Sequence, residues 1–204
     1  MLKREDYLLG TFSGLLTGLF IISILLFFFK FSFRFEWLLI IIGFPLLMLV
    51  GLGFSEFLAR FVKPFFRQFG KFAAVGFLSA SIDFFILNLM SYLTGITAGI
   101  VVGSINVPGF IIATFNGYLW NKLWVFRHEG EFLNRLSKYF LVTTIGLFLN
   151  SLIVIVLTTY IDLLPYSPDL LNLNAAKVIA TIVSLLWNFN GYKFFAFFKA
   201  SNPL

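Results

Sequence analysis

Six long apolar stretches set the main limit on what this chain can fold into. Each is about 20 residues long, the length that an α-helix needs to cross the roughly 30 Å hydrocarbon core of a bilayer. With 60% hydrophobic and 12% charged residues, the 204-residue chain has more apolar surface than a soluble domain of this size can bury. The sequence therefore predicts an all-α membrane protein with six transmembrane helices. They are expected near residues 7–29, 37–54, 72–93, 98–120, 139–161 and 175–192.

The basic residues predict how these helices are oriented. Most of the 15 lysines and arginines lie at the two termini, in the connection after the second span and in the connection after the fourth. Because lysine and arginine are enriched in cytoplasmic loops, we expect a multi-pass protein of the cytoplasmic (inner) membrane with both termini in the cytoplasm. Residues 55–71 are basic and amphipathic, which suits a linker on an anionic leaflet. The alternative is that these charges only mark the ends of helices.

The last four spans contain an internal repeat. The stretch "GKFAAVGFLSASIDFFIL" aligns without gaps with "SKYFLVTTIGLFLNSLIV", which places Asp83 on Asn150. The ends of the following spans align at a slightly larger offset, which places Lys122 on Lys193. Both copies begin on the same predicted side of the membrane, so the sequence predicts two parallel helical-hairpin repeats.

The same segments resemble a known family. The stretches "FGKFAAVGFLSASIDF", "FNGYLWNKLWVFR" and "AAKVIATIVSLLWNFNGYKFFAFF" are similar to the opening, middle and closing motifs of the GtrA-like family of small four-helix membrane proteins, over about residues 69–198. The resemblance implies a role in cell-surface polysaccharide synthesis or glycosylation. In this family the role is commonly movement of a polyprenyl-phosphate-linked sugar across the membrane, often beside a membrane glycosyltransferase. The second signature departs from the first in having Tyr192 where the first has Asn121.

The resemblance and the repeat together predict three parts. Residues 1–54 form an N-terminal transmembrane hairpin that has no counterpart in the four-helix pattern, residues 55–71 form the amphipathic basic linker, and residues 72–204 form the GtrA-like four-helix domain. Glycines spaced four residues apart, at positions 10, 14 and 18 and again at 95, 99 and 103, predict close helix contacts. We expect these contacts inside the monomer, with a homo-oligomer as the alternative.

Polar residues inside the apolar spans are the candidate site. A charge near the bilayer centre costs on the order of 3 kcal/mol, so Asp83 and Lys177 are expected to have a function. They lie on helix faces that carry small and polar residues, where amides suit sugar hydroxyls and lysine suits a phosphate. The alternatives are interhelical packing for the amides, and a snorkelling lysine with an aromatic belt for Lys122 and Lys193. The candidate substrate-binding residues are Asp83, Asn106, Asn116, Asn121, Lys122, Trp124, Asn150, Lys177, Asn188 and Lys193.

The sequence argues against most enzyme chemistry. There is no cysteine, the single histidine, His128, has no evident ligand or triad partners, and no glycine-rich phosphate loop is present. We therefore expect no metal, no cofactor, no nucleic-acid partner and no catalytic activity. The leading hypothesis is a flippase for a polyprenyl-phosphate-linked sugar that also contacts membrane lipids. The alternative is a non-transporting scaffold that anchors or orients a glycosyltransferase.

Overall fold

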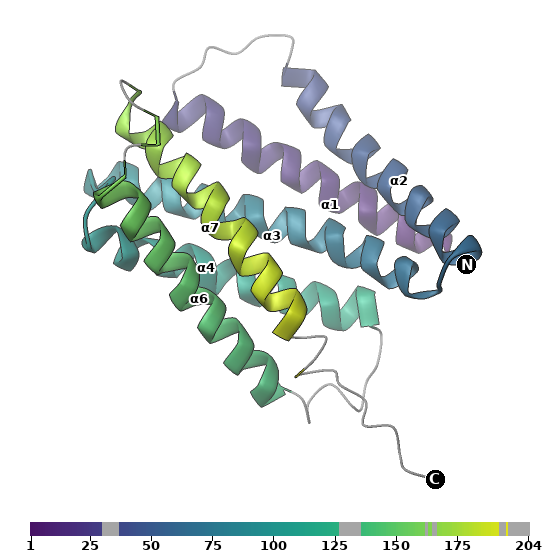
Figure 1. Cartoon of the computed structure of the whole chain (residues 1–204). Coiled ribbons are helices and arrows are strands. Elements are labelled where there is room, and N and C mark those ends of the chain that lie inside the picture. Colours follow the sequence, from purple (N-terminus) through teal and green to yellow (C-terminus); the bar gives the residue numbers. More distant parts are fainter. Residues whose placement is uncertain (30–36, 127–135, 162, 165–166, 192–194, 196–204) are drawn as a thin grey trace. The chain divides into compact units, whose positions relative to one another are not determined.

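A computed structural model describes residues 1–29, 37–126, 136–161, 163–164, 167–191 and 195, and nearly all of these residues are helical (Figure 1). Within these residues there are α-helices and two π-helical segments and no strand. In chain order the elements are α1 (Arg4–Ser23), η1 (Ile24–Phe28), α2 (Trp37–Phe61), α3 (Phe65–Thr94), α4 (Val101–Trp120), η2 (Asn121–Phe126), α6 (Leu136–Thr159) and α7 (Asp169–Gly191). The predicted all-α membrane fold is confirmed.

Five of the described helices are long and apolar enough to cross a membrane. These candidate spans are Arg4–Leu26, Trp37–Phe61, Phe65–Thr94, Lys138–Thr159 and Asp169–Asn188. The remaining expected span is present as α4, a helix of 20 residues, but it is not among the five. Its sequence contains Asn106, Pro108 and Asn116 within the apolar stretch.

The chain divides into two compact units. The first unit comprises Met1–Leu89 and Ile111–Arg127, and the second comprises Met90–Phe110 and His128–Leu204. The division therefore falls within α3 and α4, and it groups the N-terminal hairpin with most of α3. The domain boundaries predicted from the sequence, at residues 54 and 71, stay a prediction.

In the first unit, α1 and α2 form an antiparallel hairpin with close backbone contact (Figure 1). A Cβ atom on Gly14 would lie 2.7 Å from the carbonyl oxygen of Phe44 and 2.8 Å from the backbone of Pro45, and one on Gly18 would lie 3.1 Å from the carbonyl oxygen of Ile40. Only glycine allows the helices to approach this closely. The contact predicted for the first glycine series, within the monomer, is confirmed. The core residues of this unit include Met48, Leu52, Ala74, Val75, Trp124 and Val125.

The basic segment 55–71 is not a separate helix. Its first part is the end of α2, which runs to Phe61, and its second part is the start of α3, which begins at Phe65. The break between the two helices is therefore short. Glu56 near the end of α2 forms ion pairs with Arg60 and, across the break, with Arg67 near the start of α3.

In the second unit, α6 and α7 form an antiparallel hairpin (Figure 1). At one end the indole N–H of Trp187 donates to the carbonyl of Val142 over 3.0 Å.

The second glycine series differs from the prediction of close helix contacts. Gly95 and Gly99 lie in the connection between α3 and α4 with φ angles of 70° and 82°, where glycine is needed for its backbone conformation and not for helix contact. Only Gly103 lies in a helix, with its α-carbon against the side chain of Ile155.

Candidate functional site

A fully buried lysine on α7 is the centre of a polar cluster in the second unit. The side chain of Lys177 has 0% exposure, and its Nζ lies 2.5 Å from Oδ1 of Asn106 and 3.0 Å from Oδ1 of Asn150. These three residues come from α7, α4 and α6. The structure therefore brings together three of the residues that the sequence singled out.

Asn106 connects the members of this cluster. Its Oδ1 accepts from Lys177, while its Nδ2 donates to Oδ1 of Asn150 over 2.9 Å and to Oγ of Ser151 over 3.1 Å. The ammonium group can only donate, so the orientation of the Asn106 amide follows from its contact with the lysine. The resulting site offers a positive charge together with neutral amide groups.

The internal repeat relates these residues to positions in the first hairpin. In the alignment of the span ends, Lys177 of the second copy falls on Asn106 of the first, and in the alignment of the span starts, Asn150 falls on Asp83. Corresponding positions of the two hairpins thus carry polar residues of different kinds. At the position of Lys177, the lysine occurs only in the second copy.

The polar face of α7 continues from Lys177 through Thr181, Ser184 and Asn188, at spacings of three and four residues. The hydroxyl of Ser184 donates to the carbonyl four residues earlier over 2.8 Å and contacts the carbonyl of Gly146 at 3.3 Å. Asn188 packs on the same glycine, since a Cβ atom there would meet its Oδ1 at 2.6 Å. Two buried oxygens on this face, Oγ1 of Thr181 and Oδ1 of Asn188, have no hydrogen-bond partner among the described residues.

The first unit contains five of the predicted site residues, among them Asp83, Asn116 and Asn121. Asp83, on α3, is buried with 5% exposure. Asn116 on α4 donates from Nδ2 to Oγ of Ser79 on α3 over 3.1 Å. Asn121, the first residue of η2, is also buried, and its Oδ1 has no hydrogen-bond partner among the described residues. The sequence motif "NKLWVF" thus coincides with η2, a π-helical segment of a kind often found at functional sites.

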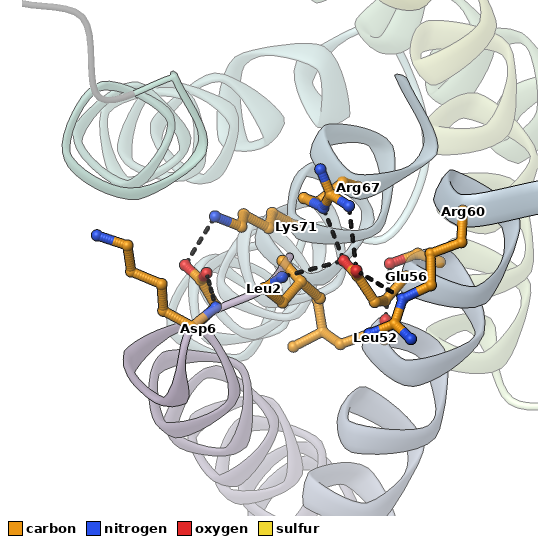
Figure 2. Close-up of polar contacts among 9 residues, drawn as sticks. Leu2, Asp6, Leu52, Glu56, Arg60, Arg67 and Lys71 are labelled. Atoms are coloured by element: carbon orange, nitrogen blue, oxygen red, sulfur yellow. Dashed lines mark hydrogen bonds and ion pairs between the residues drawn. The ribbon is translucent and has the colours of Figure 1, made fainter. Parts of the chain in front are cut away.

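A charged cluster joins the start of α1 to α3 (Figure 2). It also reaches η2 through Trp124. Oδ1 of Asp6 lies 2.7 Å from Nζ of Lys71 and accepts from the indole N–H of Trp124 over 3.0 Å, while its Oδ2 accepts from the backbone N–H of Lys3 over 2.8 Å. Asp6, Lys71 and Trp124 are all buried. One carboxylate therefore satisfies a lysine, an indole and the first turn of its own helix.

A second carboxylate, that of Glu56 at the end of α2, also accepts several hydrogen bonds (Figure 2). Glu56 accepts two bonds from Arg67, at 2.6 Å and 3.0 Å, one from Arg60 at 3.2 Å, and one from the backbone N–H of Leu2 at 3.0 Å. The guanidinium of Arg67 thus makes a bidentate contact, which is the stronger form of this interaction. The N-terminal hairpin is tied to α3 at two points about one turn apart on that helix.

These contacts change the interpretation of Trp124. The sequence suggested a substrate contact or a residue of an aromatic belt, but the side chain is 2% exposed and its N–H is bound to Asp6. Its position favours a structural role. Lys122 is half-buried in the same segment, and Lys193 lies outside the described residues, as does His128.

Sequence reasoning missed Asp6 as a partner of the family segment. An acidic residue in the first helical turn is an ordinary N-terminal signal, which predicts the bond to the Lys3 backbone but not contact with a lysine on α3. Thr181 was also missed, because a single threonine in an apolar helix gives no signal of its own.

For the described residues, no group of three or more histidine, cysteine, aspartate or glutamate side chains is placed to hold a metal ion.

Comparison with known proteins identifies the family. No curated protein and no solved structure matches the chain. A family model described as "GtrA/DPMS, transmembrane domain" matches residues 71–197, which is more than half of the chain. The match begins at Lys71, contains both hairpins of the repeat and leaves the N-terminal hairpin outside. This multi-pass membrane protein therefore belongs to the GtrA/DPMS transmembrane-domain family.

Proposed function

We propose that this protein is a flippase that moves a polyprenyl-phosphate-linked sugar across the cytoplasmic membrane for polysaccharide synthesis or glycosylation. The observation that carries the proposal is Lys177, a fully buried cation in a membrane helix whose amide neighbours come from two other helices. Such a residue opposes membrane insertion by about 3 kcal/mol, so a purely structural reason for it is weak. Family membership supports the same class of substrate.

The chemistry of the cluster suits a phosphorylated lipid headgroup. Phosphate oxygens are acceptors, and the ammonium of Lys177 has three donors. Its contacts to the amide oxygens of Asn106 and Asn150 are hydrogen bonds to neutral groups, which a phosphate oxygen can replace without creating an uncompensated charge. The freed amides then face the headgroup. The lipid tail stays in the bilayer while the polar group moves along the helices.

In this proposal the substrate comes from the cytoplasmic leaflet. Lys122 lies in η2, at the end of α4 that the charge distribution assigns to the cytoplasm, and its half-buried side chain suits a first contact with the phosphate. The orientation itself is open to a direct test, since the chain has no native cysteine. Labelling with an impermeant reagent should modify Lys63→Cys from the cytoplasmic side and Thr97→Cys from the outside. The opposite pattern would reverse the orientation.

The test of function is transport by the purified protein. Proteoliposomes that contain only the full chain and a defined polyprenyl-phosphate hexose should move the lipid between leaflets faster than protein-free vesicles. Lys177→Gln in a correctly folded protein should lose most of this activity. Absence of transport by wild-type protein that binds the lipid would remove the flippase proposal.

A second candidate is a scaffold for a membrane glycosyltransferase, and α2 is the observation that favours it. Its large apolar side chains are mostly exposed, including Leu39, Val50, Phe54 and Phe61. In a membrane this face meets lipid or another helix. Improved product yield from a transferase, with no lipid movement by the purified chain, would favour the scaffold.

A further inference from the structure

The two hairpins of the family segment differ at one pair of corresponding positions. In the first unit, Ser79 on α3 faces Gly117 on α4, and a Cβ atom on the glycine would lie 3.2 Å from Oγ of the serine. In the second unit the glycine is on α6, as Gly146, and the polar residue is on α7, as Asn188. Small and polar residues have exchanged helices between the two copies.

The hydrogen bonds at these positions also differ. In the first unit the amide of Asn116 donates to Ser79, so the polar group between the helices has a partner inside the protein. In the second unit Oδ1 of Asn188 is buried against Gly146 and has no hydrogen-bond partner among the described residues. A buried acceptor without a donor is unfavourable by about 1–3 kcal/mol, so its presence needs a reason.

Thr181 shows the same property one turn away from Lys177. Several buried serine and threonine hydroxyls in the described helices donate to the carbonyl four residues earlier, as those of Thr17, Thr143, Thr158 and Ser184 do. Thr181 can reach such a carbonyl by rotation about χ1. Its Oγ1 instead has no partner among the described residues, although the atom is buried.

The kind of atom that lacks a partner indicates the kind of ligand. An amide oxygen only accepts, and an ionised phosphate group also only accepts, so a phosphate cannot provide the donor that Oδ1 of Asn188 lacks. A sugar hydroxyl donates, and it satisfies both the amide oxygen and the threonine oxygen. Lys177 is the opposite case, since its ammonium donates and suits the phosphate.

We propose that Thr181 and Asn188 on α7 bind the hydroxyl groups of the sugar, so that α7 distinguishes a glycosylated lipid phosphate from the same lipid without its sugar. This inference rests on the proposed substrate class. By helix geometry Thr181 is about 6 Å along the axis from Lys177, and Asn188 is about 10 Å further toward the proposed cytoplasmic end. The sugar contacts Asn188 first and Thr181 when the phosphate has reached Lys177.

The experiment measures equilibrium binding, not transport. The full chain in lipid nanodiscs is titrated with a polyprenyl phosphate that carries one hexose and with the same polyprenyl phosphate without sugar. Thr181→Val and Asn188→Leu keep the branching of the side chains and remove the oxygens. Each should weaken binding of the hexose lipid by about tenfold, the equivalent of about 1.4 kcal/mol, and leave binding of the bare lipid unchanged.

Two matched variants serve as controls. Thr181→Ser keeps the hydroxyl and should retain the preference for the hexose lipid. Thr158→Val removes a buried hydroxyl on α6 that is bound to its own helix, and it should change neither affinity. A proportional loss for both lipids in folded Thr181→Val and Asn188→Leu would assign these residues to packing and overturn the inference.

The wild-type chain provides a test that does not depend on how the variants fold. It should prefer the hexose lipid when the two lipids compete, and equal affinities would overturn the inference. Failure of the proposed function gives a different result, namely no lipid movement in proteoliposomes with the binding preference intact. The two proposals can therefore fail separately.

Discussion

The cations near the start of α3 and the lysine of α7 can be compared by the contacts that the structure gives them. Lys71 and Arg67 contact the carboxylates of Asp6 and Glu56, at 2.7 Å and 2.6 Å. Lys177 contacts the amide oxygens of Asn106 and Asn150. An ion pair fixes both charges, and removing one partner leaves the other uncompensated. A bond to an amide is easier to exchange for a bond to a ligand.

This contrast indicates which cluster maintains the structure and which is suited to binding. The carboxylates of Asp6 and Glu56 belong to α1 and α2, which lie outside the family match. Lys71 is the first residue of that match. The N-terminal hairpin therefore contacts the family segment through the Asp6–Lys71 ion pair as well as through the apolar core. The cluster around Lys177 lies entirely within the match.

The strongest change should be in stability, at Asp6. Asp6→Ala removes the partner of buried Lys71 and of the Trp124 indole, so we expect a loss of about 3–5 kcal/mol in the free energy of unfolding. Unfolding of the full chain in mixed micelles measures it. Glu5→Ala, an exposed neighbour on the same turn, is the control and should change stability little. Equal stability of the two variants would mean that the ion pair does not hold the hairpin.

The second prediction concerns Glu56. Glu56→Gln keeps the shape but weakens the bidentate contact with Arg67, whose side chain is partly exposed. We expect a loss of about 2 kcal/mol in the free energy of unfolding, since hydrogen bonds to charged groups contribute about 1.5–3 kcal/mol. The loss should shrink as salt is added, because ions screen the partly exposed pair. A salt-independent loss would point to packing as its source.

The third prediction concerns the ionisable residues that we propose for substrate transport. Lys177→Gln and Asp83→Asn each remove a charge from an apolar helix, so both proteins should fold, and stability should hold or improve. Transport should nevertheless fall tenfold or more, because about 1.4 kcal/mol of lost interaction produces that factor. Initial rates against lipid concentration, with thermal stability measured on the same samples, separate the two effects. Full transport by both variants would contradict the proposal that these residues line the path of the headgroup. The scaffold function would then be favoured.

The weakest change should be at Lys122. Lys122→Gln should weaken capture of the substrate from the cytoplasmic leaflet, which raises KM by about two- to threefold and leaves kcat unchanged. The residue is half-buried near the end of its helix, so its contribution is reduced by solvent. A lower kcat with the same KM would instead place Lys122 in the translocation step.

The fold class followed from the sequence because each transmembrane helix is specified by its own residues. Length and apolar composition are local properties, and the membrane requires a helix wherever both are present. The parallel repeat and the family motifs were also visible, since corresponding residues keep a constant offset along each pair of aligned segments. A close helix contact at Gly14 was predictable for the same reason, because small residues at one spacing mark one helix face, while its partner α2 came from the structure.

The partners of the polar residues required the tertiary structure. The sequence placed Asn106, Asn150 and Lys177 on three different helices, but which face meets which depends on how the helices rotate and pack. It also suggested the lipid interface for Trp124, which the structure buries against Asp6, a residue far away in the chain that no local pattern contains. Local sequence thus specifies the helices and the types of their polar residues. Helix packing depends on all of the helices at once. It gives Lys71 and Arg67 their carboxylate partners and brings the amides of two other helices to Lys177.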